Sequence, residues 1–153
     1  MNIQVITVGS LKEDFFRSAC GEYLKRLSRF GKIQIDEVSE CKGTNGKQDI
    51  EKEGQLILKR IPQRTYIVDL CVEGKQMDSP AFADMMRVAA LNGIGAFTFI
   101  IGGSDGLSTE VKTAAALRLS FSRMTLPHQL MRVVLLEQIY RGFKINHGEN
   151  YHK

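Results

Sequence analysis

Short β-branched apolar runs alternate with longer segments of helical periodicity along the chain, and this alternation constrains the fold more than any other feature. The apolar runs are expected to form strands, and they span residues 3–8, 32–38, 65–71, 96–101 and 117–121. The segments between and after them repeat apolar residues at helical spacing, at residues 11–29, 50–61, 79–91, 109–116 and about 125–143. This order indicates βαβ units. The predicted class is therefore α/β, a three-layer sandwich with a mainly parallel sheet.

The length of 153 residues suits one compact domain spanning residues 1–153. No internal repeat or low-complexity linker divides the chain, and residues 41–48 are expected to form a polar loop. Ser10 and Glu13 have the spacing of a capping box, so we expect the first helix to begin directly after Ser10.

Charge and cysteine content set mild limits on function. The formal net charge of +4 is compatible with a polyanion such as RNA, but many proteins without such a partner are as basic. The three cysteines are far apart and form no CxxC pair, which predicts a cytoplasmic protein without a structural metal site. No apolar run approaches the ~20 residues of a transmembrane helix, so no membrane partner is expected.

The segment FIIGGSDGL places Gly102, Gly103 and Gly106 directly after the fourth expected strand. Open α/β sheets bind ligands at the carboxyl ends of their strands. The first strand is followed by VGSLKED, which lacks the glycine fingerprint of a dinucleotide site. The later glycines fit either close approach of the main chain to a ligand or a tight turn.

A second segment, FSRMTLPH, follows the fifth expected strand. Met124, Thr125 and Leu126 can present main-chain N–H and C=O groups to a flat heterocycle, while Phe121 and Leu126 supply apolar contact. Thr125 is also a candidate N-cap of the last helix. Two such loops at one sheet edge predict a small-molecule pocket.

The last helix and the C-terminal tail carry the remaining candidates. Glu137 and Arg141 are four residues apart, which favours an intrahelical ion pair, although Arg132 and Arg141 also suit phosphate binding. The tail NHGENYHK contains Tyr151 and His152. It fits either a frayed terminus or a site that stacks on a base and contacts phosphate.

FIIGGSDGL, LSFSRMTLPHQLMRVVLLEQIYRGFKI and the terminal YHK closely resemble the ribosomal RNA large-subunit methyltransferase H family, and the similarity extends to VITVGSLKE and EYLKRL. That family belongs to the SPOUT class, whose C-terminal chain forms a trefoil knot. The resemblance implies S-adenosylmethionine as methyl donor, N3 of a pseudouridine in 23S ribosomal RNA as acceptor, and a homodimer that works on the assembled ribosome. The donor-binding positions of the family map onto Leu70, Gly102, Phe121, Ser122, Arg123, Met124, Thr125 and Leu126.

The acceptor N3–H must lose its proton, so a general base or an electrostatic stabiliser is expected. Within the resemblance, the candidate catalytic residues are His152, Tyr151 and Arg141, and Glu137 is a weaker candidate. A non-catalytic α/β RNA- or ribosome-binding factor is the alternative. A small nucleotide-binding enzyme is disfavoured because no GxxxxGK[ST] motif is present.

Overall fold

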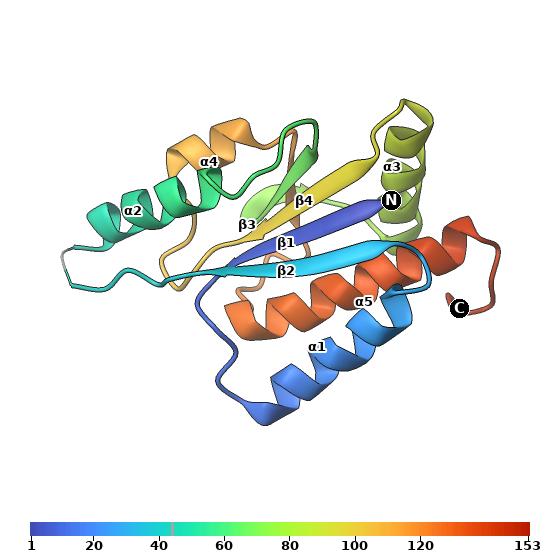
Figure 1. Ribbon diagram of the computed structural model, residues 1–153, viewed down its shortest axis with the longest axis horizontal. Coiled ribbons are helices and arrows are strands. Elements are labelled where there is room, and N and C mark those ends of the chain that lie inside the picture. The colour runs from blue at the N-terminus through green and yellow to red at the C-terminus, as the bar shows by residue number, and fades with distance from the viewer. Residues whose placement is uncertain (44) are drawn as a thin grey trace.

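The computed structural model describes residues 1–43 and 45–153, and it contains one five-stranded sheet (Figure 1). The strands lie in the order β2-β1-β4-β3-β5, and all four neighbouring pairs are parallel. Their bounds are β1 Asn2–Val8, β2 Lys32–Val38, β3 Tyr66–Gln76, β4 Ala96–Ile101 and β5 Leu117–Ser120. The predicted parallel α/β sheet is confirmed.

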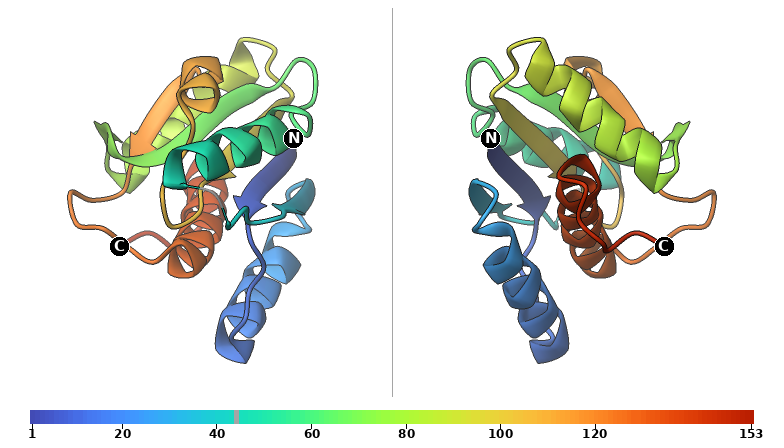
Figure 2. Two further views of the ribbon diagram at one scale, coloured as in Figure 1. Left: turned by 90° about the vertical axis from the view of Figure 1, so that its left-hand side faces the viewer. Right: turned by 90° about the vertical axis from the view of Figure 1, so that its right-hand side faces the viewer.

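Helices cover both faces of this sheet, as Figures 1 and 2 show. One face carries α1 (Asp14–Leu27), α3 (Ser79–Leu91) and α5 (His128–Asn146), and α5 packs against both of the others. The opposite face carries α2 (Gly46–Leu58) and α4 (Thr109–Ala114). The predicted three-layer arrangement is therefore confirmed, while the trefoil knot stays a prediction.

Strand β4 shows why two helical layers are needed. Its sequence AFTFII is almost entirely apolar, and successive side chains of a strand point to opposite faces. Phe97, Phe99 and Ile101 join the core beneath α1, α3 and α5, whereas Ile100 joins the core beneath α2 and α4. A strand that is apolar on both faces must be covered on both.

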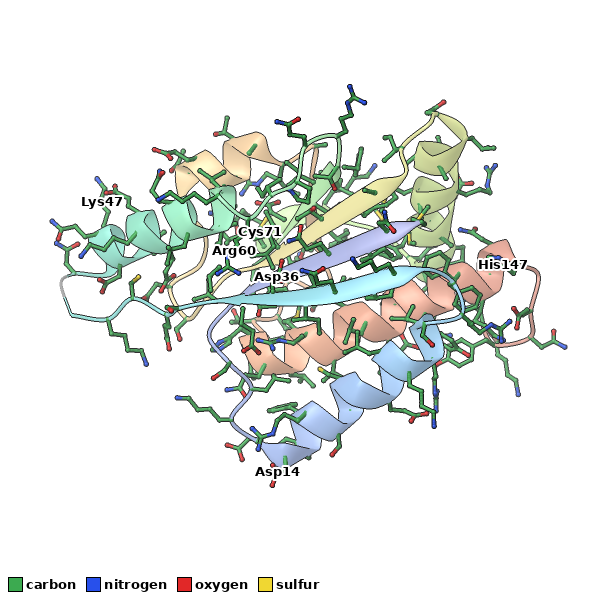
Figure 3. The ribbon with its side chains drawn as sticks, in the orientation of Figure 1. Asp14, Asp36, Lys47, Arg60, Cys71 and His147 are labelled. Carbon is green, nitrogen blue, oxygen red and sulfur yellow. The ribbon has the colours of Figure 1, made fainter. Side chains whose placement is uncertain are left out.

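The first helix begins later than the capping-box spacing predicts. Helix α1 starts at Asp14, which Figure 3 labels, and its N-cap Glu13 makes no side-chain capping bond. Gly9 has a φ of 79°, and its N–H donates to the Val38 carbonyl oxygen. The chain thus turns out of β1 into an irregular segment in which Ser10 caps no helix, so the predicted capping box is wrong.

Two other expected boundaries also change. The third expected strand ends at residue 71, but β3 continues to Gln76, and its pairing with β5 shifts register between Leu70 and Lys75. The polar loop expected at residues 41–48 ends early, because the Asn45 side chain caps α2 by accepting from the Gln48 N–H at 3.0 Å. Within that loop, Thr44 lies outside the described residues.

Candidate functional site

A cavity of about 500 Å³ opens at the carboxyl ends of β3, β4 and β5, and we call it the first cavity. Its walls come from residues 70–73 within β3, the glycine loop after β4, the loop after β5 and the start of α5. The lining residues are Leu70 to Glu73, Ile101 to Ser104, Gly106, Leu107, Lys112, Leu119 to Ser122, Met124 to His128 and Met131. This volume lies in the range of ordinary ligand sites.

The structure brings together nearly all of the residues onto which the family's donor-binding positions map. Those that line the first cavity are Leu70, Gly102, Phe121, Ser122, Met124, Thr125 and Leu126. Arg123 does not line it; this exposed residue is flanked by neighbours that do.

The glycine loop is a tight turn that forms part of the cavity wall. The Gly106 N–H donates to the Gly103 carbonyl oxygen at 3.1 Å, and Gly106 has a φ of 90°. A Cβ atom added at Gly102 would lie 2.8 Å from the Gly106 carbonyl oxygen. The turn therefore requires glycine at positions 102 and 106. The same tight turn forms part of the cavity wall, so both interpretations of the glycine loop describe one structure.

The loop after β5 leaves main-chain groups available. Ser122 stabilises it locally, since its Oγ accepts from the Met124 N–H at 3.0 Å and its carbonyl oxygen accepts from Ser120 Oγ at 2.9 Å. Within the described residues, the main chain of Thr125 and Leu126 has no hydrogen-bond partner. The Met124 side chain is 75% exposed. Unpaired main-chain donors and acceptors beside a cavity are suited to a polar ligand.

Thr125 is not the N-cap of the last helix. Helix α5 begins at His128 with Pro127 at the N-cap position, and no side chain caps it. The threonine remains an exposed lining residue of the first cavity. The capping interpretation is therefore wrong.

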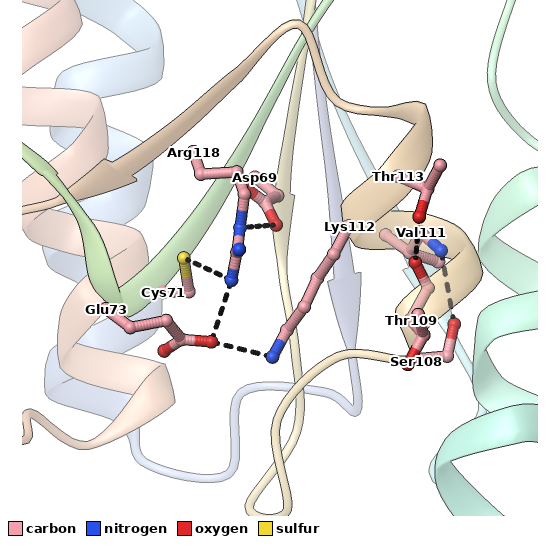
Figure 4. Close-up of polar contacts among 9 residues, drawn as sticks. All are labelled: Asp69, Cys71, Glu73, Ser108, Thr109, Val111, Lys112, Thr113 and Arg118. Atoms are coloured by element: carbon pink, nitrogen blue, oxygen red, sulfur yellow. Dashed lines mark hydrogen bonds and ion pairs between the residues drawn. The ribbon is translucent and has the colours of Figure 1, made fainter.

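One wall of the first cavity carries a polar network that the sequence did not predict (Figure 4). Glu73 Oε1 accepts from Lys112 Nζ at 2.7 Å and from Arg118 Nη2 at 2.8 Å. Arg118 also lies 3.7 Å from the Cys71 sulfur and, through Nε, 3.7 Å from Asp69 Oδ2. We call these five residues the polar wall.

Asp69 is the buried end of the polar wall. Its side chain is 0% exposed, and neither carboxylate oxygen has a hydrogen-bond partner within the described residues. Burial raises the pKa of Asp69 from 3.8 to about 6, and the nearby Arg118 and Lys112 charges oppose that rise. An ionisable carboxyl thus lies directly before Leu70, behind the cavity.

The candidate catalytic residues lie elsewhere, in the second half of α5 and in the C-terminal tail that follows it. Tyr151 Oη donates to Glu137 Oε1 at 3.2 Å, and Arg141 Nε donates to the same oxygen at 3.0 Å. The Arg141 guanidinium lies 4.6 Å from the Tyr151 ring centre, and its Nη1 lies 3.3 Å from His152 Nδ1. These four residues form the C-terminal cluster.

The C-terminal tail is ordered by this packing. The Tyr151 ring meets the Tyr140 ring edge-on at 5.0 Å between centroids. Burial, followed by the Glu137 charge, raises the pKa of Tyr151 to about 12, so its hydroxyl is protonated at neutral pH. The interpretation as a frayed terminus is wrong for Tyr151, while His152 remains exposed.

One chain does not bring the C-terminal cluster to the first cavity. None of its four residues lines that cavity. Met131 does, but Arg141 follows it by ten residues of α5, which corresponds to roughly 15 Å along a helix. Arg132, the other predicted phosphate ligand, is 2% exposed and donates to Glu37 and to the Gly9 carbonyl oxygen instead.

None of the helices within residues 1–43 and 45–153 combines the length and the apolar character needed to cross a lipid bilayer. In that same part of the chain, no group of three or more His, Cys, Asp or Glu side chains is arranged to hold a metal ion.

Comparison with known proteins agrees with this geometry. Residues 1–152 match the family model described as predicted SPOUT methyltransferase. The ribosomal RNA large subunit methyltransferase H of Oenococcus oeni is 46% identical, covering 100% of this chain and 99% of the relative. The protein of that name from Bacillus cytotoxicus is 48% identical over the whole of both chains.

A solved structure of a probable methylase family protein from Haemophilus influenzae Rd KW20 shares the fold, with a TM-score of 0.56 at 12% identity. The match covers 99% of this chain and 70% of that one. With full-length sequence matches, a parallel sheet and a cavity where the family motifs meet, the chain belongs to the ribosomal RNA large subunit methyltransferase H family of SPOUT methyltransferases.

Proposed function

We propose that this chain transfers a methyl group from S-adenosylmethionine to N3 of a pseudouridine in 23S ribosomal RNA on the assembled ribosome, and that residues 1–153 act as one SPOUT methyltransferase domain. The observation that carries the proposal is the first cavity, in which the glycine loop and residues 121–126 face one another. The names of the relatives from Oenococcus oeni and Bacillus cytotoxicus support ribosomal RNA as the acceptor.

The residues of the first cavity suit this donor. Leu70, Phe121 and Leu126 offer apolar contact to an adenine ring, and the unpaired main-chain groups of Thr125 and Leu126 suit its polar edge. Gly102, Ser122 and Met124 complete the walls, and Arg123 is expected to act from just outside. When bound, the donor supplies a methyl group already activated by a sulfonium, so the protein mainly holds the reactants in line, and we propose that no metal takes part.

The C-terminal cluster supplies proton chemistry in this proposal. We assign removal of the N3 proton to His152, and the exposure of its imidazole beside Arg141 supports this assignment. The Arg141 cation stabilises the negative charge that develops on the base. Tyr151 is protonated at neutral pH because its pKa is about 12. We therefore assign Tyr151 to stacking and hydrogen bonding rather than to proton removal.

We further propose a homodimer in which the first cavity of one protomer meets the C-terminal cluster of its partner. The separation of the two regions within one chain supports this arrangement, since a transfer needs reacting atoms about 3 Å apart. Mixed dimers can test it. One protomer would carry Gly102→Ala and the other His152→Ala, so that one composite site remains intact. Activity no higher than that of either parent homodimer would contradict shared sites.

We place the reaction in the cytoplasm because Cys20, Cys41 and Cys71 are free thiols, which favours a reducing compartment. The direct test of function measures transfer of labelled methyl from S-adenosylmethionine to unmodified ribosomes, separated subunits and free 23S RNA. We expect transfer to whole ribosomes, with donor affinity measured independently by calorimetry. Ribosome binding without any transfer would favour the alternative, a non-catalytic ribosome-binding factor.

A further inference from the structure

A second cavity of about 540 Å³ lies beside the first, at the carboxyl ends of β1 and β2. The two cavities share two lining residues, Ser104 of the glycine loop and His128 at the start of α5. The remaining walls come from the β1–α1 segment, the end of β2 and its following loop, and α5. Those lining residues are Gly9, Ser10, Lys12, Glu37 to Glu40, Lys42 and Gln129.

Interactions between distant segments hold the second cavity open. Buried Arg132 donates to Glu37 Oε1 at 2.6 Å and to the Gly9 carbonyl oxygen at 3.1 Å, and both partners line the cavity. The Lys12 N–H donates to Gln129 Oε1 at 3.2 Å. The β1–α1 segment, β2 and α5 are therefore tied together, which makes the shape of the cavity a property of the fold.

The acidic residues that line the second cavity are in ion pairs, whereas one of its lysines is not. Glu37 is paired with Arg132, and Glu40 is paired with Lys42 at 3.2 Å. Lys12 has no carboxylate partner among residues 1–43 and 45–153. One cation thus remains available at a cavity whose acidic groups are already neutralised, and this favours a phosphate as the incoming group.

Several polar side chains of the second cavity also have free hydrogen-bonding groups. Within the described part of the chain, the side chains of Ser10, Ser39, Ser104 and His128 make no hydrogen bond. N3 of a pseudouridine lies between two carbonyl oxygens, so a site for this base needs hydrogen-bond donors on either side. Hydroxyl and imidazole groups can both donate.

We propose that the second cavity holds the nucleotide that accepts the methyl group, with Lys12 paired to its phosphate and its base directed past Ser104 and His128 toward the donor in the first cavity. This inference rests on the proposed function and specifies where its RNA substrate binds. Lys12 is a substrate-binding residue in this arrangement, and it takes no part in proton transfer. Because the two cavities share Ser104 and His128, a base that reaches past these residues can meet the methyl group of the donor, as in-line transfer requires.

The test replaces Lys12 by methionine, which keeps the length of the side chain and removes its charge. We expect Lys12→Met to raise KM for unmodified ribosomes roughly fivefold at ~0.1 M salt, because one phosphate contact is lost. The slope of log(kcat/KM) against log[KCl], at fixed Mg²⁺, should become shallower by about 0.7 to 0.9. The donor Kd should stay within about twofold of wild type, and Lys12→Arg should restore the salt slope.

Lys59→Met is the matched control, since Lys59 follows the last residue of α2 and lines neither cavity. An unchanged KM and salt slope in Lys12→Met, with wild type active, would overturn this inference and leave the proposed function intact. A parallel loss of donor affinity would also overturn it, by assigning Lys12 to the first cavity. Absence of methyl transfer by wild type would instead refute the proposed function. Co-sedimentation with ribosomes measures how well each variant binds them, independently of methyl transfer.

Discussion

The first cavity and the C-terminal cluster are built by opposite means. The first cavity is shaped by main chain, with a glycine turn whose Gly102 has no room for a Cβ atom and a loop with unpaired main-chain groups at Thr125 and Leu126. The C-terminal cluster is built by side chains, in which Glu137 Oε1 accepts from both Tyr151 and Arg141.

This difference suits the first cavity to ligand binding and the C-terminal cluster to proton transfer. A site whose shape is set by a glycine turn and by main-chain groups is rigid, so it suits tight binding. A side-chain cluster can move protons and stabilise charge, but its residues need neighbours to hold them. We therefore expect substitutions in the first cavity to change donor affinity, and substitutions in the C-terminal cluster to change turnover.

The largest effect is expected at His152. His152→Ala should lower kcat for methyl transfer about 100-fold or more, since a positioned general base contributes 10²–10⁴-fold. The donor Kd from calorimetry should stay the same, because His152 does not line the first cavity. Asn150→Ala is the control in the same tail. Normal turnover in His152→Ala would remove this residue from the mechanism.

The next largest effect concerns Gly102. Gly102→Ala places a Cβ atom 2.8 Å from the Gly106 carbonyl oxygen, so the turn must shift. Overpacking of this kind costs about 1–3 kcal/mol, and we expect the donor Kd to rise roughly tenfold to hundredfold. Gly21→Ala is the matched control, because a Cβ atom there has no neighbour within 4 Å. Equal donor affinity in both variants would show that the turn does not shape the site.

A smaller effect is expected at Asp69, which should make the unfolding free energy depend on pH in a way that the C-terminal cluster does not. The pKa of Asp69 is raised from 3.8 to about 6, so between these values the folded state keeps a proton that the unfolded state releases. This group therefore favours the folded state below about pH 4, and its contribution is lost as pH rises through 6. In Asp69→Asn, the loss of unfolding free energy between pH 4.5 and 7.5 should be smaller by on the order of 1–2 kcal/mol.

Urea unfolding of wild type and Asp69→Asn at both pH values gives this difference directly. The C-terminal cluster should not contribute to it through Tyr151, whose pKa is about 12. Asp84→Asn is the control, because Asp84 pairs with Arg87 on the exposed surface of α3. If the unfolding free energy of Asp69→Asn and of wild type depends on pH in the same way, then ionisation of Asp69 does not contribute to folding stability.

The smallest effect is expected for Tyr151→Phe. This change removes the hydroxyl that donates to Glu137 but keeps the ring against Tyr140. We expect a loss of about 0.5–1.5 kcal/mol in unfolding free energy, and turnover within about threefold of wild type. Tyr151→Ala, which also removes the ring, should reduce turnover further. A hundredfold loss in Tyr151→Phe would show that the hydroxyl itself takes part in the chemistry.

The sequence predicted those features that depend on neighbouring residues. The apolar runs indicate the strands correctly, because β-branching and side-chain alternation act within a few residues. The N-cap of α4 is a local contact of the same kind, in which Ser108 Oγ accepts from the Val111 N–H at 3.3 Å. The first cavity was located by its glycine loop and by the family motif after β5, although Arg123 does not line it.

Local pattern failed where a distant partner decides the outcome. Ser10 and Glu13 have capping-box spacing, but Gly9 is held by hydrogen bonds with Val38 and Arg132, and the helix begins only at Asp14. The polar wall joins Glu73 to Arg118 across 45 residues, and no spacing rule connects them.

The amino-acid sequence by itself determined the order of strands and helices, the glycine turn and the family, since each depends on short contiguous stretches. The tertiary structure alone decided that Arg132 is a buried strut reaching Glu37 across 95 residues rather than a phosphate ligand. It also decided that His152 lies away from the first cavity and that a second cavity adjoins that cavity. The physical reason is that burial and ion pairing depend on which surfaces meet in space, and the packing of α5 against the sheet sets those surfaces.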